Sequence, residues 1–447
     1  ILIGLVGSEM CIRDSLSLFS VFGAVRAAGP DAPALRESVP FTVREGLPAT
    51  AAKLDAGEPV TIAYFGGSIT EQNGWRIQSA ELLKKLYPKA AIRSINAAIG
   101  GTGSDLGAFR LAHDVLRHKP DLVFIEFAVN DAGAKDDRVR KAVEGIVRQI
   151  RKALPDSDIC FVYTVTKGNL KDYQAGRLPR PASIMEEIAE HYRLPSVNLS
   201  YEVARLEKDG KLVMSGSKEG MTRVSGDELD AKAGVPRNAE GKIVFSGDGV
   251  HPYPDTGHVL YTRMLEQAFP ALLAKREQKT RILPAPMRAD CWENASAFPL
   301  DAPGIRLGGR CRLLPAGDPI ARPFAHRMEK LWQFDPGATI EFKFKGTKAM
   351  LYDFYGPDSA MLEITVDGKS RETRRFDGYC TYRRLSLCSL ADNLPDEVHT
   401  VKIRVLPTRF DKREILFERN RADFDKNPKK YEPVSYTHLR AHETDQY

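Results

Sequence analysis

The sequence has few cysteines and few tryptophans. Of 447 residues, six are cysteine and three are tryptophan. Outside the N-terminal Cys11, the cysteines lack the spacing of metal ligands and are too few for a disulfide scaffold. Two pairings stay open if the protein is exported, Cys380 with Cys388 and Cys291 with Cys311; Cys160 lies in an apolar strand. We therefore expect no metal site, and a fold that depends on its apolar core.

Neither sign of charge dominates, and no apolar run is long. The formal net charge is +6, with Lys and Arg scattered among acidic residues. This pattern does not indicate a nucleic-acid partner. Beyond the first residues, no segment reaches the apolar length of a membrane span. The length predicts two or three domains, and the oligomeric state stays open.

Both ends of the chain differ from the rest. Residues 1–15 back-translate to a transposase sequencing adapter, and residues 434–447 to its complementary strand in another frame. We set both segments aside as adapter-derived. Residues 16–33 are apolar and rich in small residues, which is typical of the second half of a secretory signal cleaved after Ala27, followed by a linker. The alternative is a disordered tail, and we expect a secreted or periplasmic protein.

Residues 34–280 alternate strand-like and helix-like segments. Residues 138–154 and 181–192 carry apolar side chains at helical spacing. Such alternation predicts a doubly wound parallel sheet. A long polar insertion at 205–246 interrupts it, and we expect this insertion to be either a loop that covers a functional site or a disordered loop. The expected strands are 60–65, 91–99, 121–129, 158–165 and 195–200.

The pattern changes after a linker rich in proline and charge. Residues 285–407 contain short alternating runs separated by Gly, Pro and Asp turns. They predict an antiparallel β-sandwich as a second domain. Residues 408–433 are highly charged, and we expect a tail on the surface.

Polar residues follow the predicted strands of the first domain. Because the carboxyl ends of parallel strands meet at one edge of a sheet, where ligands bind, we expect these loops to lie together. They would bring a hydroxyl, a glycine turn, a carboxamide and an Asp-His pair to one place. The four loops are Gly66-Gly67-Ser68, residues 99–105, Asn130-Asp131 and residues 248–251.

These groups are the ones that acyl transfer requires. Ser68 is a weak nucleophile unless a base such as His251 removes its proton, and Asp248 can accept from the other ring nitrogen. An oxyanion needs preorganised donors, which the backbone N–H groups of Ser68 and Gly101 and the carboxamide of Asn130 could provide. We expect Gly66 and Gly67 to leave room for the substrate.

This set of motifs resembles the SGNH hydrolases, the GDSL-type esterases and lipases. "FGGSIT", "NAAIGGTGS", "AVND" and "DGVHP" look like the four family blocks in their order, over residues 59–269. The resemblance implies a flavodoxin-like sheet and a mechanism without metal or cofactor. It also implies the nucleophile at Ser68, the base and its acid at His251 and Asp248, and oxyanion donors at Ser68, Gly101 and Asn130.

One position departs from the family pattern. Gly67 stands where the first block usually has an acid, so polar support for the serine must come from elsewhere, with Thr70 and Glu71 as candidates. Trp75 and Arg76 follow closely, and their side chains either line the substrate pocket or pack the helix.

Other interpretations of these motifs are weaker. His258 could compete as the base, but no Asp stands three residues before it. "GGTGSDLG" lacks the G-x-G-x-x-G spacing of a dinucleotide site. The G-x-S-x-G motif of α/β-hydrolases is also absent, because Thr70 occupies the position of its second glycine.

The residues around the serine favour a short acyl group on a carbohydrate. They are mainly polar, whereas a lipase needs wide apolar surface for long chains. We expect an esterase for acetyl esters of carbohydrates; a lipase or thioesterase of the same family is the alternative. A further alternative is a catalytically weak glycan-binding protein that uses exposed aromatic residues of the sandwich such as Tyr355, Tyr379 and Tyr382.

Overall fold

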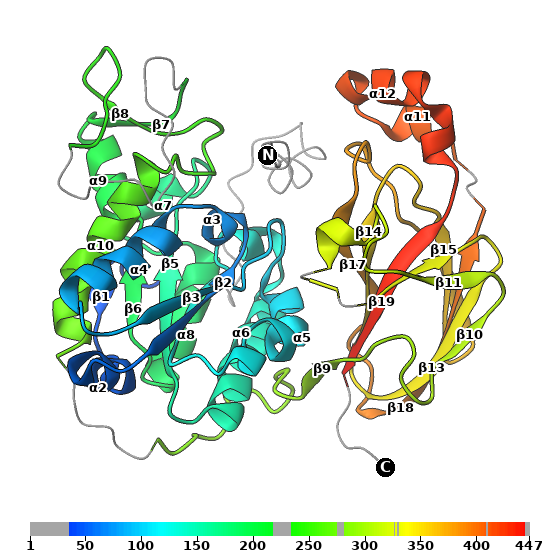
Figure 1. The fold of residues 1–447 in the computed structure, drawn as a ribbon, viewed down its shortest axis with the longest axis horizontal. Helices are drawn as coiled ribbons and strands as arrows, with labels where there is room; N and C mark the ends of the chain where they lie inside the picture. Colours follow the sequence, from blue (N-terminus) through cyan, green and yellow to red (C-terminus); the bar gives the residue numbers. More distant parts are fainter. Residues whose placement is uncertain are drawn as a thin grey trace. The chain divides into compact units, whose positions relative to one another are not determined.

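The computed structural model describes residues 35–442, except 218–233, 275–280, 326, 329, 408 and 409, and for 435–442 only the backbone. What we expected of residues 1–33, of residues 218–233 in the insertion and of the last five residues concerns parts of the chain outside the described residues. The chain divides into two units, which meet between Glu293 and Asn294 (Figure 1).

The boundary between the units lies after residue 285, where we expected the second domain to begin. Residues before it are bound to unit 1: the Trp292 N–H donates to the Lys141 carbonyl at 3.0 Å, and Glu293 pairs with Arg148. The ring of Trp292 also packs on Phe109. The last part of the predicted linker therefore belongs to the first unit.

Unit 1 is built on a six-stranded sheet with the order β1-β6-β5-β4-β2-β3. Only the β1–β6 pair is antiparallel. The five parallel strands correspond to the five predicted ones, and their order is flavodoxin-like, which confirms the expected fold. The strands are β1 (Phe41–Thr42), β2 (Val60–Gly66), β3 (Ile92–Asn96), β4 (Leu122–Glu126), β5 (Asp158–Tyr163) and β6 (Ser196–Asn198).

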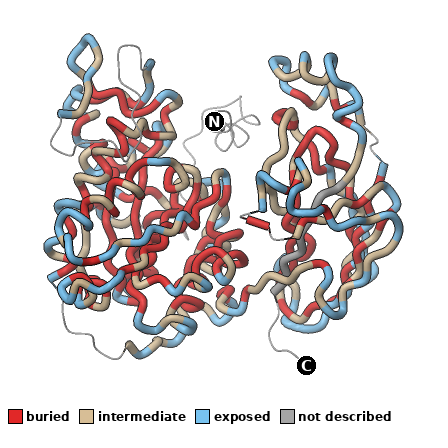
Figure 2. The backbone as a smooth tube through the Cα atoms, viewed as in Figure 1, coloured by how far each residue is buried: buried red, intermediate tan, exposed pale blue. Residues whose placement is uncertain are grey.

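Helices cover both faces of this sheet. The connection through α4 (Trp75–Leu86) moves outward to the edge strand β3, whereas those through α5 (Ser104–Asp114), α6 (Asp136–Ala153) and α8 (Arg180–His191) move the other way. Because such crossovers are right-handed, α4 lies on the face opposite α5, α6 and α8. Figure 2 shows the resulting buried centre of the unit.

The remaining elements of unit 1 frame the sheet. The helix α10 packs against α4, and the strands β7 and β8 pair in parallel inside the 205–246 insertion, which is therefore more than a loop. Among the described residues, no helix is long and apolar enough to cross a membrane. The further elements are α2 (Pro48–Ala56), α3 (Ser68–Glu71), α7 (Leu170–Gln174), α9 (Tyr201–Lys208), β7 (Leu212–Ser215), β8 (Ile243–Ser246) and α10 (Gly257–Leu272), with short turns η1 (Leu116–His118) and η2 (Asn130–Gly133).

Unit 2 is an antiparallel β-sandwich, as the sequence predicts. Its sheets have the orders β10-β13-β18-β15-β16 and β11-β12-β19-β14-β17, with β9 paired to β19. A core of buried apolar residues, including Phe342, Leu351 and Ile403, lies between them. The strands are β9 (Ala295–Ala297), β10 (Arg306–Gly308), β11 (Cys311–Leu314), β12 (Leu331–Phe334), β13 (Thr339–Gly346), β14 (Ala349–Tyr355), β15 (Met361–Val366), β16 (Lys369–Arg374), β17 (Arg384–Ala391), β18 (Glu397–Leu406) and β19 (Ser435–His442).

Two segments of unit 2 differ from expectation. The strand β19 comes from residues that we set aside, and its backbone pairs with β12 and β14. Strand pairing uses backbone groups, which every extended segment possesses. The charged segment after residue 407 is also not a simple surface tail. It forms α11 (Lys412–Ile415) and α12 (Arg421–Lys426) and buries Leu416 and Tyr431 against Phe376.

The five cysteines in the described residues are free thiols, so neither of the two pairings left open by the sequence is formed. Cys380 packs in the small cluster with Phe376 and Tyr431, whereas Cys388 lies in the core between the sheets. Cys291 and Cys311 belong to different units. Burial among apolar neighbours raises the pKa of the Cys380 and Cys388 thiols to about 12 and about 11.

Candidate active site

Ser68 lies where β2 ends at the carboxyl edge of the sheet. Gly67 is the N-cap of α3 and Ser68 is its first residue. The side chain is partly exposed, and its Oγ lies 2.7 Å from Nε2 of His251. The serine is thus hydrogen-bonded to the histidine that the sequence predicts as its base, 183 residues later in the chain.

Asp248 orients that histidine. Its Oδ2 lies 2.7 Å from Nδ1 of His251, and its Oδ1 accepts the backbone N–H groups of Val250 and His251, both at 2.8 Å. Burial raises the pKa of Asp248, but the hydrogen bonds from His251 and Val250 outweigh it and hold the carboxyl well below its usual range. The carboxylate is therefore ionised and can bind an imidazolium.

Protein groups occupy the space that a side chain would need at the two glycines before Ser68. A Cβ on Gly67 would lie 1.9 Å from Oδ1 of Asn130, and one on Gly66 would lie 2.5 Å from the carbonyl oxygen of Glu126. Contact of Gly67 with substrate stays a prediction, whereas the Asn130 side chain lies directly beside this glycine. This contact places the Asn130 carboxamide next to the serine turn.

The glycine turn after β3 approaches the serine from the other side. Gly101 is exposed and has φ +72°, a left-handed conformation that glycine adopts without steric cost. The Gly100 N–H donates to Oε2 of Glu71 at 2.9 Å, and an ideal Cβ on Gly100 would lie 3.4 Å from the Ser68 Cβ. Glu71 thus fixes this turn beside Ser68, which is part of the polar support expected from Thr70 or Glu71.

Two backbone donors of the site have no acceptor among the described residues. They are the N–H groups of Ser68 and Gly101. For Ser68 this follows from its place at the start of α3, since the first N–H groups of a helix lack intrahelical acceptors. Together with the nearby carboxamide of Asn130, these groups can bind an anionic oxygen.

Trp75 does not line a pocket. Its side chain is 0% exposed and packs edge-on against Tyr64 and Phe124 in the core. Arg76 is also buried, and it donates to the Thr70 carbonyl and to Asn73. Of the two interpretations of these residues, helix packing is correct.

His258 cannot compete with His251 as the base. It is 0% exposed, its Nδ1 accepts the Trp75 N–H at 3.2 Å, and its Nε2 lies 3.1 Å from Oε1 of Gln72. Burial, with the nearby His251 and Arg76, lowers the pKa of His258 to about 3. It is therefore a neutral structural residue of α10 that accepts from the start of α4.

Sequence reasoning missed two buried acids next to the site. Glu126 is 0% exposed at the end of β4, and Asp131 is 3% exposed and accepts the Ser104 N–H at 3.0 Å. Burial, together with the charge of Asp105, raises the pKa of Asp131 to about 7. The only signal for Glu126 was an acid within an otherwise apolar strand.

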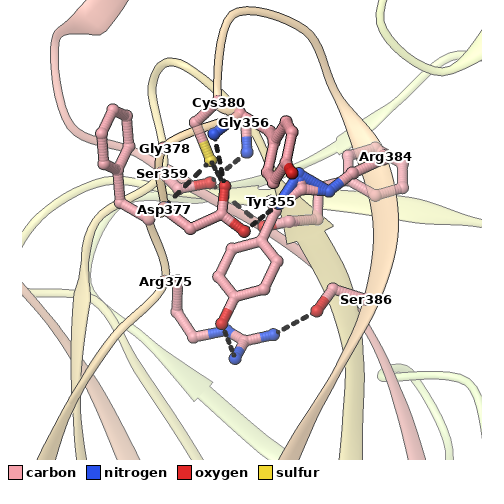
Figure 3. Close-up of polar contacts among 12 residues, drawn as sticks. Tyr355, Gly356, Ser359, Arg375, Asp377, Gly378, Cys380, Arg384 and Ser386 are labelled. Atoms are coloured by element: carbon pink, nitrogen blue, oxygen red, sulfur yellow. Dashed lines mark hydrogen bonds and ion pairs between the residues drawn. The ribbon is translucent and has the colours of Figure 1, made fainter. Parts of the chain in front are cut away.

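Two of the aromatic residues considered for glycan binding in unit 2 have protein side chains against their rings, and Figure 3 shows Tyr355 close to Arg375 and Arg384. The guanidinium groups of Arg375 and Arg384 lie 4.4 and 5.0 Å from the ring centroid of Tyr355. Tyr379 is 8% exposed and packs against Phe417 at 4.5 Å. Among the described residues, no group of three or more His, Cys, Asp or Glu side chains is placed to hold a metal ion.

The chain shares sequence features and its fold with known proteins. Residues 64–221 match the model of the GDSL-like Lipase/Acylhydrolase family. This match contains Ser68, Gly101 and Asn130 and ends before Asp248 and His251. No curated protein matches the chain.

The solved structures with a similar fold include esterases. A two-domain esterase active on acetylated mannans is 21% identical with a TM-score of 0.65, over 91% of this chain and 100% of that one. The same kind of esterase, co-crystallised with mannopentaose, gives 20% identity and a TM-score of 0.64 over the same shares. An acetylxylan esterase from Geobacillus stearothermophilus covers 48% of this chain and 94% of its own, at 18% identity and a TM-score of 0.35.

Proposed function

We propose that this chain, a carboxylic ester hydrolase with a GDSL-like lipase/acylhydrolase domain at residues 64–221, removes short acyl groups, acetyl above all, from carbohydrates. Ser68 is the nucleophile, His251 the general base and Asp248 its orienting acid. The observation that carries this proposal is the continuous hydrogen-bonded chain from Ser68 Oγ through both ring nitrogens of His251 to Asp248, with both distances 2.7 Å.

Acylation follows from this geometry. The Nε2 of His251 takes the proton from Ser68 Oγ as the oxygen attacks the ester carbonyl carbon. The carbonyl π-electrons move to its oxygen, which becomes an oxyanion. When the oxyanion collapses, the bond to the alcohol breaks, and the imidazolium gives its proton to the departing alcohol oxygen. Asp248 stabilises the imidazolium while it exists.

Deacylation repeats the sequence with water. His251 removes a proton from a water molecule as its oxygen attacks the acyl-serine carbonyl, and the returned proton releases Ser68 and the carboxylic acid. In both steps the oxyanion accepts from the Ser68 and Gly101 N–H groups and from the Asn130 carboxamide. These donors are held in place before the reaction, which is the condition for strong stabilisation of a transition state.

The surroundings of Ser68 support a small acyl group and a polar alcohol. The large apolar side chains that are exposed in the described residues are Val39, Leu86, Tyr201, Ile282, Leu313, Val398 and Phe417. None belongs to the loops 66–75, 97–105, 127–135 or 247–253 around the serine. A long acyl chain would need such surface, whereas a hydroxyl-rich leaving group suits a polar rim.

The fold similarity adds support by analogy. Two-domain esterases with the same architecture act on acetylated mannans, and acetylated polysaccharides are extracellular polymers. We therefore include export of the protein and an acetylated polysaccharide substrate in the proposal.

Substrate profiles test the proposal. We expect kcat/KM for p-nitrophenyl acetate to exceed that for the octanoate ester, and acetate release from acetylated mannan, xylan or pectin. A preference for octanoate with no acetate released from any glycan would indicate a lipase or thioesterase instead. Binding of glycans without any ester hydrolysis would indicate a glycan-binding protein.

Two histidine variants test the base. His251→Ala should abolish turnover, because among the described side chains no other imidazole is hydrogen-bonded to Ser68 Oγ. His258→Ala should change kcat by less than about tenfold, since His258 holds the start of α4 and does not contact the serine. Turnover by the first variant with loss in the second would reassign the base.

A further inference from the structure

A buried carboxyl group lies beneath the turn that presents Ser68. Glu126 is the last residue of β4, is 0% exposed and lies opposite Gly66 in the parallel register of β2 and β4. Glutamate is rarely buried completely unless it has partners. The proposed mechanism does not use Glu126, so its place in the core requires another reason.

Glu126 joins three segments around the serine. Its Oε2 accepts from the Thr70 hydroxyl at 3.0 Å, and its Oε1 accepts from the Thr164 hydroxyl at 2.8 Å. Burial raises the pKa of Glu126, and these hydrogen bonds oppose the rise because they favour the ionised form. The donors come from α3, shortly after the serine, and from the loop after β5.

A buried cation holds the backbone on the other side of the serine. Arg110 of α5 is 0% exposed, and its Nη2 donates to the Gly66 carbonyl oxygen at 3.1 Å. Its Nη1 pairs with Asp114 at 2.8 Å. The Gly66 carbonyl belongs to the planar peptide group that links Gly66 to Gly67. The serine turn is therefore held by a guanidinium before Ser68 and by a carboxylate, through Thr70, after it.

The turn itself has no room for an acid of its own. With Asn130 beside it, a side chain at residue 67 would meet Oδ1 of Asn130 at 1.9 Å from its Cβ. The acid that the family pattern places directly before the serine is thus absent from this turn. Glu126 supplies a carboxylate to the same turn from the neighbouring strand.

We propose that Glu126 is a positioning residue that, by binding Thr70 after the serine while Arg110 binds Gly66 before it, fixes the turn and thereby the Ser68 hydroxyl and the Ser68 N–H; this inference rests on the proposed role of Ser68. The Ser68 N–H and Oγ follow directly after the held peptide, so a shift of the turn would displace nucleophile and oxyanion donor together. A misplacement of reacting groups by about 1 Å costs roughly a hundredfold in rate.

The test compares Glu126→Gln with Glu144→Gln in the full chain. Glu144 is also buried, at 1% exposure, but it accepts from Tyr192 and from the linker backbone, away from Ser68. We expect Glu126→Gln to lower kcat for p-nitrophenyl acetate roughly ten- to a hundredfold with KM within about twofold. Glu144→Gln should leave both constants within about twofold, even where both variants lose similar thermal stability.

Two hydroxyl variants keep the proposal testable if Glu126→Gln does not fold. Thr70→Val and Thr164→Val each remove one donor and retain the carboxyl group. Each should lower kcat several-fold without a matching change in KM. Wild-type kcat in every folded variant, or a loss in Glu126→Gln that Glu144→Gln reproduces, would overturn the positioning role.

Labelling by a fluorophosphonate separates this inference from the proposed function. The wild-type chain should be labelled at Ser68, and Glu126→Gln more slowly by about the same factor as its kcat. If the wild type is active but is not labelled at Ser68, the proposed nucleophile is wrong. If Ser68 is labelled equally fast in both chains, only the role of Glu126 is refuted.

Discussion

The two units both bury an arginine and a carboxylate, but they use these groups differently. In unit 1, Arg110 donates to the Gly66 carbonyl before Ser68 and Glu126 accepts from the Thr70 hydroxyl after it, while Ser68 itself stays partly exposed. In unit 2, Arg375 binds Asp353 through two hydrogen bonds at 2.6 and 2.5 Å and also donates to Ser386 and Tyr355. The first set leaves donors free for a substrate, and the second satisfies its own members (Figure 3).

This difference shows why buried charge alone does not identify a site. Asp353 and Glu126 are both fully buried, and burial raises the pKa of each. What distinguishes the serine turn is the presence of donors without protein acceptors beside an accessible hydroxyl. The cluster around Tyr355 therefore stabilises unit 2, whereas the cluster around Ser68 prepares a reaction.

The largest expected effect is on kcat, and it distinguishes the Ser68 hydroxyl in unit 1 from the Ser386 hydroxyl in unit 2. Ser68→Ala should lower kcat at least about ten thousandfold, because the nucleophile is lost. Its free energy of unfolding should change by less than about 1 kcal/mol, since the side chain is partly exposed. The matched control is Ser386→Ala, which removes a hydroxyl bonded to Arg375 in unit 2 and should retain full activity. Turnover by purified Ser68→Ala would refute the assignment of the nucleophile.

The next effect concerns the oxyanion donors. Asn130→Ala should lower kcat roughly a hundred- to a thousandfold, the usual result of losing one such donor. KM should change far less, because the donor acts mainly in the transition state. Steady-state kinetics with p-nitrophenyl acetate measure both constants. An effect on KM alone would mean that Asn130 binds the substrate instead.

In unit 2 we expect a loss of stability without a loss of chemistry. Arg375→Met leaves Asp353 buried without its partner, which should lower the free energy of unfolding by about 3–5 kcal/mol. Arg375→Met/Asp353→Leu should recover most of this loss, because replacing both charges removes the unpaired group. Denaturant unfolding measures the stability, and hydrolysis of p-nitrophenyl acetate by the folded fraction should be unchanged. Reduced kcat in that fraction would show that the Tyr355 cluster acts on the reaction.

The smallest expected effect is the pH dependence that Asp131 introduces. Its pKa is raised to about 7 by burial and by Asp105, so the native state binds this proton more tightly than the unfolded state. Stability from this group is present below about pH 4 and is lost as the pH rises through about 7. Between pH 5 and 8 the free energy of unfolding should therefore decrease in the wild type by more than in Asp131→Asn. The two decreases should differ by more than about 1 kcal/mol. Parallel curves for the two proteins would contradict the raised pKa.

Much of the fold could be predicted because its signals are local. The central strands β4 and β5 are nearly continuous apolar runs, and helices between the strands have apolar residues at helical spacing. The motifs at the strand ends could be placed together because parallel strands end at the same edge of a sheet. The geometry brings Ser68, His251 and Asp248 into hydrogen-bond contact, as these motifs suggest.

The errors concern the fate of single side chains. Trp75 and Tyr355 were candidates for contact with substrate or glycan, but Trp75 packs on Tyr64 and Phe124, and Tyr355 lies beneath two arginines. An aromatic residue near a motif looks the same in sequence whether it faces solvent or core. The segment 408–433 was misjudged for a related reason, since its few apolar residues find partners only in the folded unit.

The sequence by itself determined the order of strands and helices, the change from parallel to antiparallel architecture, and which residue types stand at the strand ends. Periodicity and turn residues carry that information within a few neighbouring positions. Only the tertiary structure decided that Asn130 fills the space beside Gly67, that His258 is buried, and that the buried Glu126 accepts from Thr70 of the serine turn. Each of these depends on contacts between residues far apart in the chain, and a side chain's role follows from the partners that folding brings to it.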